Sequence, residues 1–474
     1  MLGLSPQPTI SPFRYLERAR TVAATGYNRW LVPPAALAIH LSIGQAYAFS
    51  VFNLPLTRVI GVTESAPTDW KLTTLGWIFS LAIVFLGLSA AVFGKWLEAA
   101  GPRKAMFASA VCFSGGFLVS ALGVWFHQVW LLYLGYGVLG GIGLGLGYIS
   151  PVSTLIKWFP DRPGMATGLA IMGFGGGAMV GAPLAEALMN YFRTPTSTGV
   201  AETFVAMGVI YFCFMMFGAV MVRLPPPGWR PARYTPETVR AQLAAPSDLT
   251  ADEAIKTRQF WLLWAVLFLN VTAGIGVLGQ ASPMIQELFT GRVTAAAAAG
   301  FVGLLSLFNM VGRFFWSSLS DYIGRKSTYT VFFLLGAVLY ALTPQTSRLG
   351  LVVLFVLGFA IIISMYGGGF ATIPAYLRDL FGTAQVGAIH GRLLTAWSAA
   401  GVAGPVLVNY IREYQLEHGV SRAEAYTVTM FIMAALLLVG LVCNLLVHPI
   451  KRALGSVLTI GQDVRSLRTE NAHD

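Results

Sequence analysis

Two loop segments with one shared pattern decide the fold: Gly94-Lys95-Trp96-Leu97-Glu98-Ala99-Ala100-Gly101-Pro102-Arg103-Lys104 and Asp321-Tyr322-Ile323-Gly324-Arg325-Lys326. In each, an acid precedes a glycine by three residues and a basic pair follows, with Pro102 inserted in the first segment. Glu98 lies 223 residues before Asp321, and the same offset joins three glycine pairs: Gly101 and Gly324, Gly168 and Gly391, Gly181 and Gly404. One offset in corresponding loops and helices indicates two homologous halves. We expect a tight turn at each loop glycine and a helix-end role for each acid.

The amino-acid composition indicates the environment in which this chain folds. Of the 474 residues, 56% are apolar and 11% are charged, whereas a soluble domain carries about 25% charged residues. This excludes a soluble globular protein, a disordered chain and a fibrous repeat. A helix needs about 20 apolar residues to cross a bilayer. The intervals between charged residues hold twelve such segments, at residues 30–54, 72–93, 105–125, 129–148, 164–191, 204–222, 260–284, 294–319, 327–342, 351–373, 387–411 and 428–447.

A polar, proline-rich stretch divides these segments six and six. We therefore expect an all-α membrane protein whose twelve transmembrane helices form two homologous six-helix bundles in the lipid bilayer. The expected parts are a tail at residues 1–29, a first bundle at 30–223, a linker at 224–259, a second bundle at 260–448 and a tail at 449–474. One short surface helix is predicted near residues 236–243 of the linker.

The distribution of basic residues predicts the orientation. With the N-terminus inside, 22 of the 31 Lys and Arg residues face the cytoplasm and 7 face outward, while Arg313 and Arg392 fall within predicted spans. Because cytoplasmic loops are enriched in Lys and Arg, both termini are expected to be cytoplasmic in a multi-pass inner-membrane protein. The formal charge of +11 is then a topology signal and requires no nucleic acid.

Several chemistries are not expected. The three cysteines lie in separate apolar stretches without metal or redox spacing. A phosphate loop ending in Gly-Lys-Ser/Thr is missing from the sequence, which argues against ATP as the energy source. We see no cluster of nucleophiles, acids or metal ligands at one membrane depth, so we expect neither an enzyme nor a cofactor or metal site. A non-transporting sensor is disfavoured because only 23 residues follow Lys451.

Arg313 is the most informative single residue. It precedes Asp321 by eight residues, which is about 12 Å along a helix and places it inside the bilayer. Asn309 and Arg313 belong to a polar helix face that also carries Ser306 and Ser317. A charge at mid-span costs about 2.5–3.5 kcal/mol, and the predicted spans offer no obvious acidic partner. An anionic substrate would pair with the guanidinium through two hydrogen bonds. The alternative is a gate residue paired with Asp321 or Asp379.

The repeated acid-x-x-Gly-Arg-Lys loop resembles the recurrent loop motif of the major facilitator superfamily, and this resemblance covers the chain from Trp30 to Val447. It implies transport by alternating access, in which two bundles rock around a site near the membrane midplane. It also implies that the Glu98 and Asp321 loops latch the cytoplasmic side.

Three longer strings, at residues 157–164, 256–264 and 309–316, resemble the oxalate–formate antiporter family, which moves small carboxylates. Arg313 matches that family's substrate-binding arginine. Tyr47 and Tyr148 match its aromatic cavity residues. Phe174 and Phe370 stand where its dicarboxylate carrier has tyrosines, and Tyr366 where it has a tryptophan. We expect these aromatic residues, with Asn309, to line the site; the alternative for any one aromatic residue is core packing.

Trp397 departs from the family pattern. The dicarboxylate carrier has a lysine at the matching position of its eleventh helix. One arginine cannot neutralise two carboxylates, and an unpaired charge is costly to bury. A monocarboxylate such as formate, lactate, pyruvate or glycolate therefore fits better than oxalate. Trp397 is expected to shape the wall of the site, or else to pack between helices.

Three further residues are candidates for a proton site or a gate. His40 and His390 can titrate near neutral pH, unless they are structural residues. Arg392 is predicted to point away from Trp397 and to act as a gate residue paired with an acid such as Asp161, or to snorkel to the membrane surface.

We therefore expect a secondary transporter, most simply a monomer, that moves a small monocarboxylate by proton symport or by exchange for a counter-anion. An oxalate:formate antiporter is the alternative. The mid-span arginine disfavours cationic drugs, and a sugar site would need more buried amides and acids.

Overall fold

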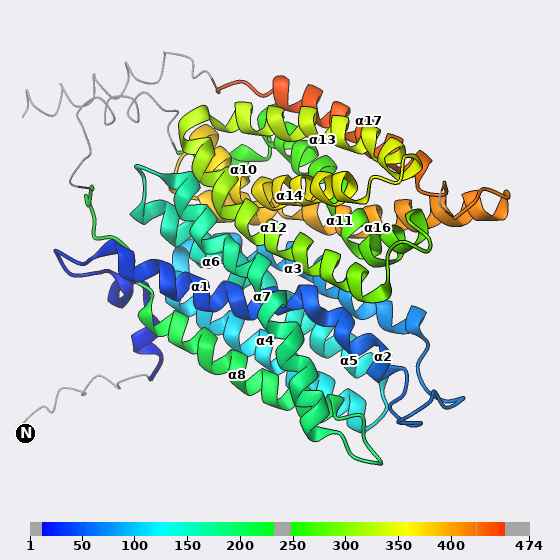
Figure 1. Ribbon diagram of the computed structural model, residues 1–474. Coiled ribbons are helices and arrows are strands. Elements are labelled where there is room, and N and C mark those ends of the chain that lie inside the picture. The colour runs from blue at the N-terminus through cyan, green and yellow to red at the C-terminus, as the bar shows by residue number, and fades with distance from the viewer. Residues whose placement is uncertain (1–11, 232–247, 423, 451–474) are drawn as a thin grey trace, which may run out of the picture.

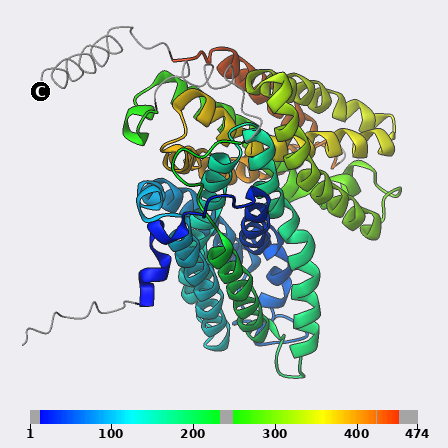
Figure 2. The same ribbon diagram turned by 90° about the vertical axis from the view of Figure 1, so that its left-hand side faces the viewer.

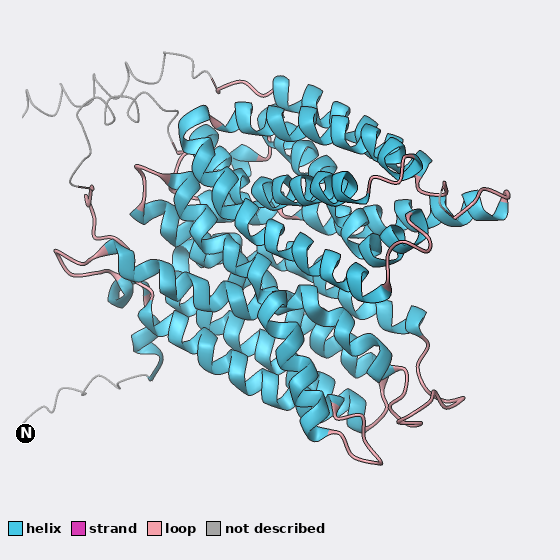
Figure 3. Ribbon diagram, viewed as in Figure 1, coloured by secondary structure: helices cyan, strands magenta, loops and turns pink. Residues whose placement is uncertain are grey.

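The computed structural model describes residues 12–231, 248–422 and 424–450. These residues form helices and loops without named strands (Figure 3). Twelve helices are long and apolar enough to cross a membrane, which confirms the predicted all-α fold. The first and second sets of six lie as two bundles, one below the other in Figure 1.

The first bundle begins with a composite span, Arg29–Leu56. This span consists of η3 (Arg29–Leu31), α1 (Val32–Ile43), η4 (Gly44–Phe52) and α2 (Asn53–Leu56), and the 3-10 segment η4 carries Tyr47. The other spans are α3 (Leu72–Ala100), α4 (Pro102–Trp125), the composite of α5 (Val129–Leu132), the π-helical η5 (Tyr133–Gly140) and α6 (Gly141–Trp158), then α7 (Pro163–Phe192) and α8 (Val200–Met221). Two short 3-10 turns, η1 (Pro12–Leu16) and η2 (Arg18–Thr21), precede them.

The second bundle repeats the plan. Its spans are α11 (Arg258–Leu288), α12 (Ala295–Ile323), α13 (Arg325–Arg348), α14 (Val352–Phe381), the pair α15 (Val386–Leu393) and α16 (Thr395–Glu417), and α17 (Thr427–Leu445). A four-residue helix, α10 (Ala251–Ala254), lies between the bundles in sequence, and Thr250 and Glu253 cap its start. The surface helix predicted near residues 236–243 lies outside the described residues.

Most helices are longer than predicted. The fourth span was expected to end at Tyr148 but continues to Trp158, and α14 passes its predicted end by eight residues to Phe381. The prediction used apolar intervals, and the bilayer requires only about 20 residues per helix. The helices extend beyond that thickness because their backbone hydrogen bonds do not depend on it.

The two loop glycines adopt nearly the same backbone conformation, as predicted. Gly101 has φ 90° and ψ 163°, and Gly324 has φ 85° and ψ 150°. A positive φ is strained for residues with a Cβ atom. Each glycine ends one span and is followed at once by the next, so it reverses the chain in a single residue.

The chain after α8, the start of α11 and the end of α17 lie at one end of the molecule, on the left of Figure 1. We call this end the linker side. Figure 2 turns it toward the viewer and shows both bundles reaching it. The loops between the first and second spans and between the seventh and eighth spans lie at the opposite end.

Candidate functional site

Arg313 is completely buried in α12 and does not face lipid. Its Nε donates a 2.8 Å hydrogen bond to Oδ1 of Asn309, one turn earlier on the same helix. Neither terminal nitrogen, Nη1 or Nη2, has a hydrogen-bond partner within the described chain. Asp321 and Asp379, the alternative partners, both bind Arg325 instead. The described residues thus leave a buried guanidinium whose terminal nitrogens make no close hydrogen bond, although the Tyr47 and Tyr148 hydroxyls are near enough to interact with it.

Two glycines on neighbouring helices make room for this side chain. A Cβ atom at Gly175 of α7 would lie 3.0 Å from Arg313 Nε and 3.1 Å from Asn309 Oδ1. A Cβ atom at Gly367 of α14 would lie 3.1 Å from Arg313 Cγ. Both contacts are tighter than normal packing. Arg313 therefore occupies a slot between the two bundles that larger residues would close.

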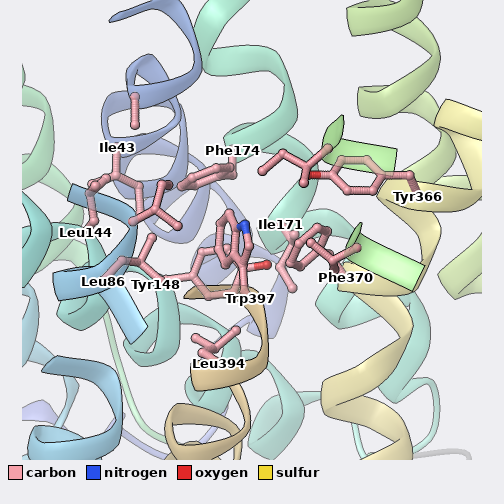
Figure 4. Close-up of a cluster of buried hydrophobic side chains, with 14 of the residues drawn as sticks. Ile43, Leu86, Leu144, Tyr148, Ile171, Phe174, Tyr366, Phe370, Leu394 and Trp397 are labelled. Carbon is pink, nitrogen blue, oxygen red and sulfur yellow. The ribbon is translucent and has the colours of Figure 1, made fainter. Parts of the chain in front are cut away.

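Six aromatic side chains surround the same region. Figure 4 shows Tyr148, Phe174, Tyr366 and Phe370 gathered around Trp397. The Trp397 ring lies 4.5 Å from Phe370, 5.3 Å from Tyr148 and 5.4 Å from Phe174, measured between ring centroids. The Arg313 guanidinium lies 5.3 Å from the ring of Phe370 and 5.6 Å from that of Phe174, within cation–π range.

Tyr47 completes this aromatic group. Its ring lies 5.0 Å from that of Phe174, and its hydroxyl lies 3.3 Å from the hydroxyl of Tyr366. Tyr47 comes from the first bundle and Tyr366 from the second, so this hydrogen bond crosses between them. The structure brings together all eight residues proposed from the sequence to line the site: Arg313, Asn309, Tyr47, Tyr148, Phe174, Tyr366, Phe370 and Trp397.

Several buried donors in this group lack partners within the described chain. They are the two terminal nitrogens of Arg313, the hydroxyl of Tyr148 and Nε1 of Trp397. An unpaired buried donor costs about 1–3 kcal/mol. The Tyr47 and Tyr148 hydroxyls both interact electrostatically with Arg313. Together these groups can donate hydrogen bonds to one small anion, and the rings exclude water around it.

The two histidines lie on either side of Tyr148. The His40 ring is 5.4 Å from the Tyr148 ring, and the His390 ring is 5.8 Å from it. Both histidines are buried. Nδ1 of His40 lies 3.2 Å from the carbonyl oxygen of Ala36, and both ring nitrogens of His390 are without partners in the described chain.

The two acid loops connect the bundles on the linker side. Glu98 accepts a 3.1 Å hydrogen bond from the backbone N–H of Gly387, at the start of α15. Asp321 accepts 2.8 Å hydrogen bonds from the backbone N–H groups of Gly164 and Met165, at the start of α7. A carboxylate is well placed at a helix N-terminus. Gly164 and Gly387 are again 223 residues apart, so the two contacts are related by the internal repeat.

Each latch carboxylate also has a cationic partner in its own bundle. Glu98 pairs with Lys157 at 2.5 Å and accepts a hydrogen bond from Ser153. Asp321 pairs with Arg325 at 2.5 Å. The predicted helix-end role of the two acids is confirmed by these contacts.

Arg392 pairs with an acid, as predicted, but this acid is Asp252 and not the example Asp161. Arg392 donates a 2.6 Å hydrogen bond to Asp252 of α10. Asp161 is instead held by Arg29 through two hydrogen bonds, of 2.6 and 3.0 Å. Sequence alone allows any acid on the linker side, whereas the folded chain brings α10 next to α15.

Sequence reasoning missed that the linker residue Asp252 contacts both bundles. Asp252 also pairs with Lys95 at the end of α3, so one carboxylate contacts both bundles. Asp248 accepts hydrogen bonds from the backbone N–H groups of Thr383 and Ala384. The signal available in the sequence was the short acidic stretch before Lys256. The two slot glycines, Gly175 and Gly367, were also missed as site residues.

The repeated bundles, the buried arginine between them and the paired contacts of Glu98 and Asp321 define a class, the secondary transporters that work by alternating access. The sequence profile of the Major Facilitator Superfamily matches residues 21–405, and the chain belongs to this family. It is therefore a membrane transporter and not an enzyme.

Among individual proteins, the chain is 28% identical to the oxalate:formate antiporter of Oxalobacter formigenes, over 82% of this chain and 87% of that protein. It is 24% identical to apicoplast pyruvate carrier 1 of Toxoplasma gondii, over 74% of this chain and 72% of that protein. The crystal structure of the Escherichia coli fucose:proton symporter superposes with a TM-score of 0.61 at 12% identity, covering 89% of this chain and all of that one. The structural likeness shows the fold.

Proposed function

We propose that this transporter moves a small monocarboxylate and that Arg313 binds its carboxylate group. The observation that carries the proposal is the buried guanidinium whose Nη1 and Nη2 have no partner within the described chain. A carboxylate would satisfy both nitrogens in a bidentate pair. The similarity to an oxalate:formate antiporter and to a pyruvate carrier supports this substrate class.

The charge of the site favours a monoanion over a dianion. Arg392, the other arginine in a predicted span, is bound to Asp252 on the linker side. Trp397 occupies the wall facing Phe174 and Phe370 and supplies one neutral N–H donor. A second carboxylate would therefore enter a dry aromatic site without a cation, which is unfavourable. The rings suit an apolar or very small remainder, as in formate, lactate, pyruvate or glycolate.

We infer that the structure represents the state closed on the linker side. The Glu98 and Asp321 latches join the two bundles there, and Arg378 donates a hydrogen bond across to the carbonyl of Pro160. In the proposed topology, with bundles at residues 30–223 and 260–448 and both tails cytoplasmic in the inner membrane, this is the cytoplasmic side. The substrate would then reach Arg313 from the side opposite the linker, before the Glu98 and Asp321 contacts open.

Uptake into liposomes that contain the purified full-length protein tests the proposal. Labelled formate, lactate, pyruvate and oxalate are each supplied with a pH gradient, and again with internal unlabelled substrate. We expect uptake of one or more monocarboxylates and a loss of at least roughly 100-fold in Arg313→Gln, since breaking a buried charge pair costs several kcal/mol. Arg313→Lys keeps the charge without the bidentate edge and should restore only part of the rate.

Arg292→Gln is the matched control, because Arg292 is exposed and bonds only to the carbonyl of Gly350 among the described contacts. It should transport normally. Wild-type uptake by a well-folded Arg313→Gln protein would contradict the assignment of the site.

A further inference from the structure

A cavity of about 370 Å³ lies in the first bundle, at the end opposite the linker side. The loop before α3 and the loop before α8 both reach this end (Figure 1). Leu54 of the first span and Met189 of α7 contribute to an apolar wall, and Arg58, Arg193 and Glu186 contribute charge. Cavities that hold small ligands typically begin at about 300 Å³. The space is therefore sufficient for a small carboxylic acid.

The two arginines of this cavity have no carboxylate partner within the described chain. Arg58 donates only to two backbone carbonyl oxygens of its own segment, at 3.2 and 3.5 Å, and Arg193 is exposed. At the same end of the second bundle, by contrast, Arg348 and Arg412 are each paired with a glutamate. A guanidinium has five N–H donors. The cavity therefore has cationic donors with unused hydrogen-bonding capacity.

The loop that carries Arg58 is held in one conformation. Asp69 accepts hydrogen bonds from three backbone N–H groups between residues 60 and 66, at 2.9, 3.1 and 2.8 Å. Val62, which also lines the cavity, has a φ of 60°, a strained conformation for a β-branched residue. Such strain persists only where the surrounding structure maintains it, and it is common at ligand sites. This wall is thus preformed, and a ligand would not need to order it.

The cavity and the Arg313 site share one side of α7. Gly175 of α7 faces Arg313, since a Cβ atom there would lie 3.0 Å from its Nε. Glu186 and Arg193 follow Gly175 by eleven and eighteen residues, which is about three and five helical turns, and Arg193 is the first residue after the helix. Residues separated by whole turns lie on the same side of a helix. The side of α7 that contacts Arg313 therefore leads to the cavity, about 27 Å further along.

The first span makes the same connection. Tyr47 is the one partly exposed ring among the six aromatic residues around the site, and the other five are buried. The span that carries Tyr47 continues to Val51 and Leu54, which line the cavity. Two elements, the first span and α7, thus line both the site and the cavity. Since the Glu98 and Asp321 contacts join the bundles on the linker side, the cavity lies on the side from which the substrate would approach.

The charges in the cavity favour weak binding of an anion. Two arginines and one glutamate give a net charge of about +1, and a cleft of one sign attracts the opposite ion. Glu186 forms no ion pair with either arginine among the described residues, so its carboxylate opposes the anion without neutralising the cations. A site along a transport path must also release its ligand inward, which requires that binding be weak.

We propose that Arg58 and Arg193 form a capture site, which binds the carboxylate of the incoming substrate before it reaches Arg313. This inference rests on the proposed function and adds a second, weaker binding site on the path to the first. The arginines recognise the carboxylate that formate, lactate and pyruvate share, and the apolar wall accommodates the rest of the molecule.

Initial uptake rates of cells that produce the full-length protein test the inference, because the cavity faces the medium in the proposed topology. The substrate is whichever of labelled formate, lactate and pyruvate the wild type carries. Arg58→Gln and Arg193→Gln should each raise KM roughly threefold, and the double variant roughly tenfold, with a smaller effect on the maximal rate. Glu186→Gln removes the opposing charge and should lower KM roughly threefold. High ionic strength should reduce all of these differences.

Arg292→Gln is the matched control, since Arg292 lies at the same end of the second bundle and outside the cavity. It should keep the wild-type KM. An equal rise of KM in Arg292→Gln would attribute the effect to total surface charge and overturn the capture site, and so would an unchanged KM in the double variant. A wild-type protein that takes up none of the three acids would contradict the proposed function and, with it, this inference.

Arginine modification reports on the cavity without transport. Phenylglyoxal reacts with accessible guanidinium groups, and mass spectrometry measures the modified fraction at each arginine. In the full-length Arg313→Gln protein, the transported acid should slow the modification of Arg58 and Arg193 and leave that of Arg292 unchanged. If the wild type transports the acid and neither cavity arginine is protected, the capture site is refuted and the proposed function stands.

Discussion

The two bundles are alike on the linker side and different at the centre. On the linker side, Gly101 and Gly324 make the same turn, and Glu98 and Asp321 each reach the first helical residues of the other bundle. At the centre, the residue 223 positions before Arg313 is Ala90, which packs beneath Gly391. On the proposed function, opening and closing would thus use both bundles alike, whereas the cation that binds the anion would come from the second bundle alone.

The aromatic residues of the site also include positions that are alike in the two bundles and positions that differ. Phe174 and Trp397 are 223 residues apart, and their rings pack edge to face with centroids 5.4 Å apart. Tyr366 and Phe370, in contrast, correspond to Gly143 and Gly147 of the first bundle. The first bundle uses these glycines for close packing against α4, and the second uses the same positions to line the site. The repeat therefore preserves the two glycine turns and the two acid contacts, whereas these positions near the centre differ between the bundles.

Breaking the Glu98 or the Asp321 contact separately is the strongest test of the similarity between the two bundles on the linker side. Asp321→Asn weakens two backbone hydrogen bonds and one ion pair, while Glu98→Gln weakens one backbone bond between the bundles and one ion pair. At about 1.5–3 kcal/mol for a hydrogen bond to a charged group, we expect amide exchange at the start of α7 to accelerate roughly 10–100-fold in Asp321→Asn. The effect of Glu98→Gln at the start of α15 should be smaller.

Hydrogen–deuterium exchange followed by mass spectrometry measures both effects. The start of α11, which Thr257 caps through the N–H of Phe260, touches neither acid and serves as the internal control. Equal protection of α7 in the wild type and in Asp321→Asn would show that the latch does not hold this state.

Trp397→Lys tests whether the lack of a second cation in the candidate site selects against dianions. It places a second cation where Trp397 contacts Tyr148, Phe174 and Phe370. A dianion would then meet two positive charges, and we expect the ratio of oxalate to lactate uptake to rise by roughly tenfold. Competition by unlabelled oxalate against labelled lactate measures the change. Trp397→Phe keeps the aromatic wall without the cation and should leave the ratio low; a rise in this control would attribute selectivity to volume and not to charge.

The fold was predictable from the sequence because membrane insertion depends on local composition. Apolar intervals and one repeated offset identified all twelve spans, and helix ends were wrong where helices continue beyond the bilayer, as at Trp158. Arg313 could be selected because a charge at that depth is costly. The slot formed by Gly175 and Gly367 could not be predicted, since the neighbours of these glycines on other helices are set by tertiary packing and not by nearby sequence. The particular acid that pairs with Arg392 could not be predicted for the same reason.

Asp252 is a further connection between the bundles and lies in the linker, outside the repeated helices. Lys95 and Arg392, one from each bundle, donate hydrogen bonds to it and lower the pKa of this carboxyl to about 2. A depressed pKa means that the contribution to linker docking is complete above the ordinary carboxyl pKa and is lost only as the pH falls through about 2. We therefore expect no change in linker docking from this group between roughly pH 5 and 8.

Asp252→Asn should have the smallest effect. Because Asp252 is exposed and its ion pairs are screened by solvent, we expect uptake to change by less than about fivefold, with the pH profile unaltered. Asp248→Asn is the matched control, since Asp248 bonds to Thr383 and Ala384 of the second bundle only. Rates measured from pH 5 to 8 compare the two. A pH profile altered by Asp252→Asn alone would mean that the Asp252 carboxyl titrates between pH 5 and 8. This result would contradict its lowered pKa and would make the linker a pH-sensitive connection between the two bundles.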